Sequence, residues 1–200
     1  MANTLEKLMS TLLATNQLAL RLKNETASQH EYMHQLMHQA QVFSDSQHYA
    51  QFTLGQYYFQ QNVEHLFRHP EVSALITDLD IRGRSQAALL DLYDLGIKPD
   101  AQQLVTEKVG FAEALGWIYV SEGSTLGAAF LFKQAQQQLG LSADFGARNL
   151  AAYPEGRAKV WKHFINELDT AELSQHEQEQ VIQGAKQAFD YFGSLLKNML

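Results

Sequence analysis

Apolar residues recur at helical spacing along almost the whole chain, and no stretch alternates apolar and polar residues with the period of two typical of a half-buried strand. The helix formers Gln, Leu, Ala and Glu are abundant, whereas the 200 residues include 3 prolines. This pattern predicts an all-α fold. A chain of this length can bury its own core, and it contains neither a linker nor an internal repeat, so we expect a single domain over residues 1–200.

Breaks in the apolar pattern delimit the predicted helices. We expect helices over residues 18–37, 47–67, 71–95, 102–138, 154–168 and 171–199, with a loop over 142–153. Gly96 and Gly140 follow the third and fourth helices, where glycine commonly ends a helix. Pro154 suits the first turn of the fifth helix, because a first-turn residue needs no N–H donor. The predicted architecture is a helical bundle.

Composition excludes several classes of protein. The formal net charge is −7 and no dense Lys/Arg stripe is present, which argues against nucleic acid as a partner. Without cysteine there are no disulfides, iron–sulfur clusters or thiolate ligands, so any metal must be held by His, Met, Tyr or carboxylates. The chain contains no run of about 20 apolar residues, which is the length that a membrane-spanning helix needs. Residues 8–20 are only mildly apolar and lack the basic start of a signal peptide, and we expect a cytoplasmic protein.

The segment from Leu115 to Phe132 carries three glycines, Gly116, Gly123 and Gly127, inside a strongly helical region. Each glycine in a helix interior costs about 0.5–1 kcal/mol relative to alanine, so the three together need a physical reason. Their offsets of seven and four residues place them on nearly the same helix face. A flat molecule could approach the backbone along such a face. Close packing against another helix and a kink are the alternatives, and spacing alone favours these two.

Three histidines, His30, His34 and His38, follow one another at i+4 spacing on the first predicted helix. Glu31 and His34 form a Glu-x-x-His step, which is the ligand pattern of di-iron helix bundles. A di-iron site also needs a second Glu-x-x-His step and two further helix carboxylates, and the chain has no second copy. A zinc site through two of these histidines would lack an obvious third ligand.

A site with one histidine ligand is the simpler hypothesis. One neutral imidazole is enough as the proximal ligand of a heme iron, provided that the opposite face stays open to oxygen. Met33 and Met37 would add soft apolar surface beside such a ligand. Spacing alone does not decide which of the three histidines would serve.

Two motifs resemble those of heme oxygenases. Thr26-Ala-Ser-Gln-His30 is similar to the proximal-helix motif of that family, and the segment Ala114–Phe130 is similar to its distal helix. Three further segments, Gln56–Gln60, Glu64–Arg68 and Phe145–Arg148, resemble the bacterial iron-acquisition branch. The resemblance covers nearly the whole chain. It implies a single-domain heme oxygenase-like helical bundle, with heme between a proximal helix and a glycine-kinked distal helix.

The resemblance also implies roles for individual residues. His30 would be the proximal iron ligand, and Gly123 and Gly127 would let the distal helix lie over the porphyrin. Better-known members carry an aspartate where this chain has Ser124, so the proton network must be arranged differently here. Arg84 is a candidate for that network because it matches an arginine of the bacterial branch, and a surface arginine is the alternative.

Further heme contacts are expected from Met33 beside the ligand and, through the resemblance, from Lys23, His38, Tyr119, Gln134 and Phe192. In the bacterial branch the position of Lys23 can be Asn and that of His38 can be Lys, so the sequence leaves the propionate anchors open. Trp117, Phe130 and Phe132 are expected in the core instead.

The implied activity is heme oxygenase, which cleaves heme oxidatively to biliverdin, carbon monoxide and free iron for iron acquisition. Heme b would be both cofactor and substrate, O2 the oxidant, and the electrons would come from outside. The chain has no Gly-x-Gly-x-x-Gly turn, flavin site or cluster ligands, so a ferredoxin, a flavodoxin or an NAD(P)H reductase is the expected donor. The alternatives are a heme carrier or sensor that keeps the ring intact and a thiaminase-like helical bundle without heme. The sequence does not decide which meso carbon is attacked.

Overall fold

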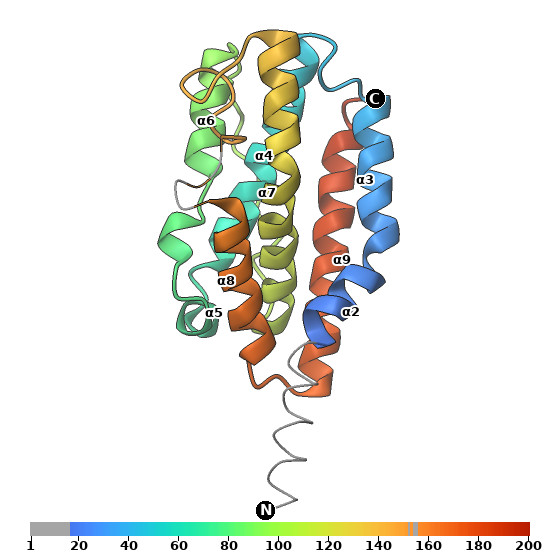
Figure 1. The fold of residues 1–200 in the computed structure, drawn as a ribbon, viewed down its shortest axis with the longest axis vertical. Coiled ribbons are helices and arrows are strands. Elements are labelled where there is room, and N and C mark those ends of the chain that lie inside the picture. Colours follow the sequence, from blue (N-terminus) through green and yellow to red (C-terminus); the bar gives the residue numbers. More distant parts are fainter. Residues whose placement is uncertain (1–16, 152, 154–155) are drawn as a thin grey trace, which may run out of the picture.

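The computed structural model describes residues 17–151, 153 and 156–200, and these residues form a helical bundle without strands (Figure 1). The elements in chain order are α2 (Gln17–Glu25), α3 (Ala27–Gln39), α4 (Ser46–Leu66), α5 (Pro70–Leu75), the short 3-10 helix η1 (Leu79–Ile81), α6 (Ser85–Asp94), α7 (Phe111–Leu139), α8 (Arg157–Thr170) and α9 (Gln175–Lys197). The all-α prediction is confirmed.

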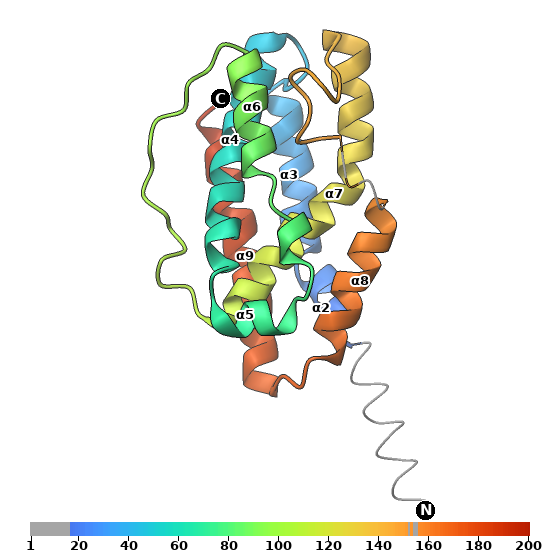
Figure 2. The ribbon, with the colours of Figure 1, turned by 90° about the vertical axis from the view of Figure 1, so that its left-hand side faces the viewer.

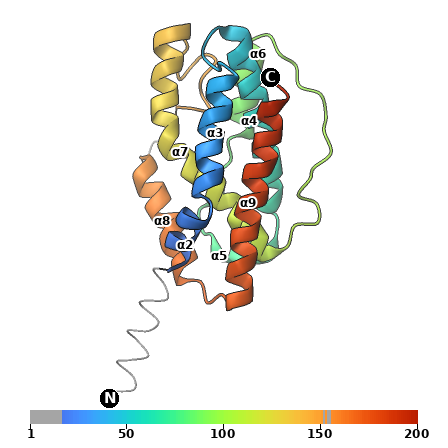
Figure 3. The ribbon, with the colours of Figure 1, turned by 90° about the vertical axis from the view of Figure 1, so that its right-hand side faces the viewer.

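The helices share one hydrophobic core. The long helix α7 packs most extensively against α9 and also contacts α4 and α8, while α3 lies beside α9 (Figure 3). The segment between α6 and α7 runs along the outside of the bundle (Figure 2). The apolar core draws residues from every long helix of the described part. That residues 1–200 form one domain stays a prediction.

Two glycines bring the backbones of α7 and α9 into direct contact. A Cβ atom on Gly116 of α7 would lie 2.0 Å from the carbonyl oxygen of Val181, and one on Gly184 of α9 would lie 2.1 Å from that of Glu113. Only glycine fits at either position, because the neighbouring atoms are backbone and cannot rotate away. Helix packing, one of the alternatives considered for the three glycines of the segment from Leu115 to Phe132, is therefore the role of Gly116.

Helix α7 changes direction midway along its length (Figure 2). Two hydroxyls in this helix bond back to carbonyls of the preceding turn, from Ser124 to Ser121 O and from Thr125 to Glu122 O, each at 2.6 Å. Such back-bonding often bends a helix. The helix ends at Gly140, whose φ of +68° is the left-handed conformation expected of a glycine cap.

The third predicted helix, over 71–95, is wrong as a single element. The chain forms α5, η1 and α6 there, because distant carboxylates bind backbone N–H groups that a continuous helix would use internally. The N–H of Thr77 donates to Glu167 at 3.0 Å, and those of Arg84 and Ser85 donate to Glu64 at 2.6 Å each. These hydrogen bonds are tertiary, so the local apolar pattern carries no sign of them.

Other predicted boundaries shift for local reasons. The first helix is broken at Thr26, whose hydroxyl donates to Leu22 O at 2.7 Å and whose backbone leaves the helical region. The fourth begins at Phe111 instead of residue 102, where the Glu113 carboxylate accepts from Gly110 N. The last begins after Ser174, which forms a capping box with Glu177.

Two sequence predictions fall partly or wholly outside the described residues. These are the interpretation of residues 8–20 as something other than a signal peptide and the first-turn position of Pro154. Among the residues that the structure describes, no helix combines the length and the apolar character needed to cross a membrane.

The close contact of α7 and α9 at Gly116 leads to a prediction about stability. We expect Gly116→Ala to lower the free energy of unfolding by about 3 kcal/mol or more, because the new methyl group would overlap backbone of α9. Gly127→Ala is the matched control on the same helix, since a Cβ there meets nothing within 4 Å. It should raise the stability of the ligand-free protein by about 0.5–1 kcal/mol. Urea unfolding of both variants measures the difference, and equal effects would contradict the packing role of Gly116.

Candidate active site

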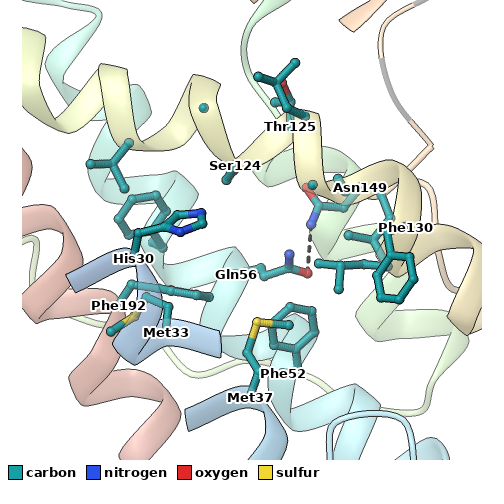
Figure 4. A pocket seen from close by; sticks show the side chains of 18 of the residues that line it. His30, Met33, Met37, Phe52, Gln56, Ser124, Thr125, Phe130, Asn149 and Phe192 are labelled. Atoms are coloured by element: carbon teal, nitrogen blue, oxygen red, sulfur yellow. Dashed lines mark hydrogen bonds between the residues drawn. The ribbon is translucent and has the colours of Figure 1, made fainter. Parts of the chain in front are cut away.

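A cavity of about 1280 Å³ opens between α3 and the second half of α7. It exceeds the roughly 300–1,000 Å³ of ordinary small-molecule sites, so it can take a large ligand. Aromatic side chains line it on the core side, with Phe52 and Phe59 from α4 and Phe189 and Phe192 from α9. Figure 4 shows side chains of α3 and α9 facing α7 across this space.

The residues proposed from the sequence for the site all line this one cavity. Lys23 comes from the end of α2, Arg84 from the residue before α6, and the others from α3, α7 and α9. The residues brought together in this way are Lys23, His30, Met33, His38, Arg84, Tyr119, Gly123, Ser124, Gly127, Gln134 and Phe192.

His30 projects from α3 toward the interior of the cavity (Figure 4). Its ring packs edge-on against His34 at 4.8 Å and against Phe189 at 6.4 Å between ring centroids. Burial is the main reason why the pKa of His30 is lowered, and the neighbouring His34 lowers it further. A lowered pKa keeps the imidazole neutral at physiological pH, which is the form that binds a metal.

The other two histidines of α3 lie toward the edge of the cavity. His34 and His38 also line a shallow surface depression together with Glu31, whereas His30 does not; all three histidines are exposed. In the described part of the chain, the group of three side chains close enough to share a metal ion is not on α3 but consists of Asp78, His163 and Glu167. Among the described residues, Glu31 and His34 therefore have no third side chain close enough to complete a metal site with them.

The glycines of α7 divide into two kinds. Gly116 is closed by α9, whereas Gly127 faces open space and Gly123 would bring a Cβ only to ordinary contact with Trp161, at 3.6 Å. Gly123 and Gly127 both line the cavity. At these two positions α7 has no side chain of its own between its backbone and the cavity.

Arg84 is half-buried and bonded to other residues. Its guanidinium donates to the carbonyl and the hydroxyl of Ser121, at 3.0 and 2.8 Å, and to the phenol oxygen of Tyr153 at 3.1 Å. Burial raises the pKa of Tyr153 to about 12, so the phenol stays protonated at neutral pH. The hydroxyl of Ser124, by contrast, donates to Ser121 O at 2.6 Å.

A buried ion pair lies behind these groups. Tyr153 donates to the carboxylate of Glu122 at 3.1 Å, and Arg82 donates to Glu122 at 2.5 Å and to Asp78 at 2.6 Å. The side chains of Arg82 and Glu122 are 0% and 1% exposed. An isolated charge at such depth would be strongly unfavourable, so the two groups depend on each other.

The sequence analysis missed Arg82, Glu122 and Tyr153. A signal existed for Glu122 alone, because it is the one charged residue between Leu115 and Phe132. A charged side chain in an apolar helix needs a buried partner or a function. Arg82 lies within the helix predicted over 71–95 and Tyr153 in the loop predicted over 142–153, and nothing in either local pattern marks them as members of a buried network.

The far end of the cavity is polar where α7 meets the following loop. Asn149 donates to Gln56 at 3.0 Å (Figure 4), and its buried Oδ1 accepts no hydrogen bond from the described residues. Arg157 donates to Thr125 O at 2.8 Å and to Leu150 O at 2.7 Å, which ties the start of α8 to this end.

One aromatic prediction is wrong. Phe130 was expected in the core, but it is 65% exposed and lines the cavity, because the second half of α7 extends away from the bundle. Trp117 is buried and stacks on Phe59 with ring centroids 5.9 Å apart, as expected of a core residue. Phe132 is partly buried and packs against the core.

Comparison with known sequences gives a consistent result. A family model described as heme oxygenase matches residues 16–198. The chain is 43% identical over 179 residues to heme oxygenase PigA of Pseudomonas aeruginosa, in an alignment that covers 88% of this chain and 90% of that protein. The resemblance drawn from the motifs is confirmed.

Solved structures agree with the sequence comparison. The NO- and CO-bound heme oxygenase of Neisseria meningitidis superposes with a TM-score of 0.84 at 35% identity, over 91% of each chain. The heme oxygenase of Leptospira interrogans superposes with a TM-score of 0.72, over 90% of this chain and 98% of that one. Its identity is 17%, so this second likeness concerns the fold alone.

The buried ion pair generates the next prediction. We expect Glu122→Ala to lower the free energy of unfolding by about 3 kcal/mol, because it leaves buried Arg82 with Asp78 as its remaining partner. The matched control is Glu25→Ala, which breaks the exposed pair with Arg21 and should cost less than about 1 kcal/mol. Denaturant unfolding measures both, and a Glu122→Ala variant as stable as the control would contradict the role of the pair.

Proposed function

This chain belongs to the heme oxygenase family, and from that premise we propose that it binds heme b in the cavity between α3 and α7, with His30 as the proximal iron ligand. Heme oxygenases use heme as both cofactor and substrate and open the ring to biliverdin, carbon monoxide and iron. The observation that carries the proposal is that one cavity is lined by His30 of α3 and, from α7, by the glycines Gly123 and Gly127.

The residues present fit a heme. The cavity is large and its core side is aromatic, as a broad apolar macrocycle requires. A Cβ on Gly127 would meet nothing within 4 Å, so the helix leaves space for a flat group. The buried Oδ1 of Asn149 accepts no hydrogen bond from the described residues, which supports a polar ligand or water at this end.

When bound, the heme iron supplies the site at which O2 is reduced and directed against the ring. His30 would hold the iron through its imidazole. The chain has no cysteine, so a thiolate ligand of the kind that favours O–O cleavage is excluded. On the opposite side, the stretch of α7 with Gly123 and Gly127 would exclude bulk solvent while leaving room close to the backbone.

Proton delivery is assigned to Arg84 and its partners. Tyr153 keeps its proton at neutral pH and is bonded to Arg84, which in turn donates to Ser121, within one helical turn of Gly123 and Ser124. The proton of Ser124 is directed at a backbone carbonyl, so this serine is better suited to accept a hydrogen bond than to supply a proton. Ordered water would complete such a relay.

Polar side chains at the margin of the cavity would hold the heme carboxylates. Lys23 and His38 are exposed there, and both of them and Gln134 can donate hydrogen bonds to a carboxylate. Nearer the core, Met33, Tyr119 and Phe192 would contact the ring. These assignments also determine the orientation of the ring and hence the meso carbon that is attacked.

The electrons must come from a separate protein. Heme oxygenases need an external reductant, and we propose a ferredoxin, a flavodoxin or an NAD(P)H reductase for this chain, because its sequence offers no flavin, nicotinamide or cluster site of its own. Release of iron from acquired heme is the proposed purpose, in the cytoplasm.

The ligand assignment predicts different behaviour of two neighbouring histidines. His30→Ala should abolish the histidine-ligated ferric spectrum and weaken hemin binding by roughly tenfold or more, since losing even an outer partner of a metal ligand costs about that much. His34→Ala should keep both the spectrum and the affinity. A hemin titration followed by absorbance measures both variants. A parental spectrum in His30→Ala would show that another residue binds the iron.

The activity is tested by turnover of the hemin complex. With ascorbate or a reductase system and O2, the parent protein should lose the heme Soret band and form a bilin, which chromatography identifies together with the carbon attacked. The His30→Ala complex, prepared in the same way, should turn over far more slowly. A parent complex whose Soret band persists in the presence of reductant and O2 would instead indicate a carrier or sensor.

A further inference from the structure

A second group of side chains, all of types that bind metal ions, lies outside the cavity, where α8 meets the segment between α5 and η1. It consists of Asp78, His163 and Glu167, none of which lines the cavity. His163 and Glu167 are four residues apart on α8 and therefore lie on the same helix face. Asp78 lies close to His163 and belongs to the non-helical segment between α5 and η1, where the sequence had predicted a continuous helix.

The three side chains are spaced like ligands of one ion. His163 Nε2 lies 3.3 Å from Glu167 Oε1 and 3.8 Å from Asp78 Oδ2, and one ligand atom from each residue falls within 4.8 Å of the others. Ligand atoms at about 2.1 Å from a tetrahedral metal are about 3.4 Å apart. Small side-chain rotations therefore bring all three to coordination distance.

Glu167 supplies a second, independent observation. Its side chain is 10% exposed, and its Oε2 is shielded from solvent yet accepts no hydrogen bond from the described residues. A buried carboxylate oxygen without a hydrogen-bond partner destabilises the folded protein. A cation that binds this oxygen would remove that cost. The other oxygen of this carboxylate, Oε1, lies 3.3 Å from His163 Nε2, so a cation held between the two residues would lie beside the same carboxylate and would have Oε2 as a further ligand atom.

Both carboxylates are already held in place. Arg82 binds Asp78 through two hydrogen bonds, at 2.6 and 2.8 Å, which leaves lone pairs on both carboxylate oxygens. Thr77 donates to Glu167 Oε1 from its backbone N–H at 3.0 Å and from its hydroxyl at 2.5 Å. Hydrogen bonds of this kind orient metal ligands and are found around established metal sites.

The surroundings favour a cation with some ligands from water. His163 is 47% exposed, so one side of the group is open to solvent. Arg82 is shared between Asp78 and the buried Glu122, so its single positive charge does not cancel the charge of both carboxylates. A nitrogen ligand with two carboxylates suits first-row divalent metals such as zinc, manganese or ferrous iron better than calcium or magnesium, which prefer oxygen ligands alone.

We propose that Asp78, His163 and Glu167 form a binding site for a divalent first-row transition-metal cation, separate from the cavity. A bound ion would link the segment before η1 to α8. Because Asp78 also binds Arg82, the ion would stabilise the loop that carries both arginines of the buried network.

Calorimetric titration of the purified chain with Zn2+ tests the site. The parent should bind one equivalent, and His163→Ala and Glu167→Gln should each weaken that binding by about tenfold or more. Glu167→Gln keeps the shape of the side chain and an oxygen acceptor for Thr77, so it should fold normally. His34→Ala is the matched control, because it removes a histidine from α3, the other segment where zinc could bind, and it should leave the affinity unchanged.

Three outcomes would overturn the proposal. These are equal Zn2+ affinity in the parent and both site variants, loss of binding in His34→Ala alone, and displacement of Zn2+ by an equal concentration of Ca2+. A second measurement does not depend on heat of binding. Zn2+ should raise the melting temperature of the parent and of His34→Ala but not that of Glu167→Gln, and hemin titration of each variant checks that the cavity is intact.

Discussion

The close contact between the backbones of α7 and α9 determines where the other elements can lie. At Gly116 and Gly184 no side chain separates the two helices, so the first half of α7 is fixed in the core and buried on nearly all sides. The second half then extends away from α9 and forms one side of the cavity. Glycines in one helix thus serve two purposes, close packing at Gly116 and open backbone at Gly127.

A chain of charged and polar groups connects the cavity to the outer face of α8. It passes from Arg84 through Tyr153 and Glu122 to Arg82 and then to Asp78. Each member satisfies the next in a region from which water is largely excluded, so the members are energetically coupled. The same chain therefore positions the proposed proton donors of the cavity and one ligand of the proposed metal site.

Local patterns were sufficient for much of the fold. Apolar periodicity predicted helices that end close to their observed limits where a glycine or a cap closes them, as at Gly140 and Gly96. It failed over 71–95, where Glu64 and Glu167 bind backbone N–H groups from distant segments. It also failed for Phe130, because amphipathicity does not reveal that a helix extends beyond its core. Both failures come from contacts between residues far apart in the chain.

For the site, the sequence by itself determined the family and the candidate residues on α3 and α7. The reason is that a reaction requires particular residue types at fixed spacings, and these are visible as sequence motifs. The tertiary structure alone decided that Gly116 packs while Gly127 faces the cavity, that Arg84 is bonded to Ser121 and Tyr153, and that Asp78 meets α8. The physical reason is that burial, pKa and hydrogen-bond partners depend on neighbours in space. Spacing along one helix specifies a face, but only packing specifies what that face meets.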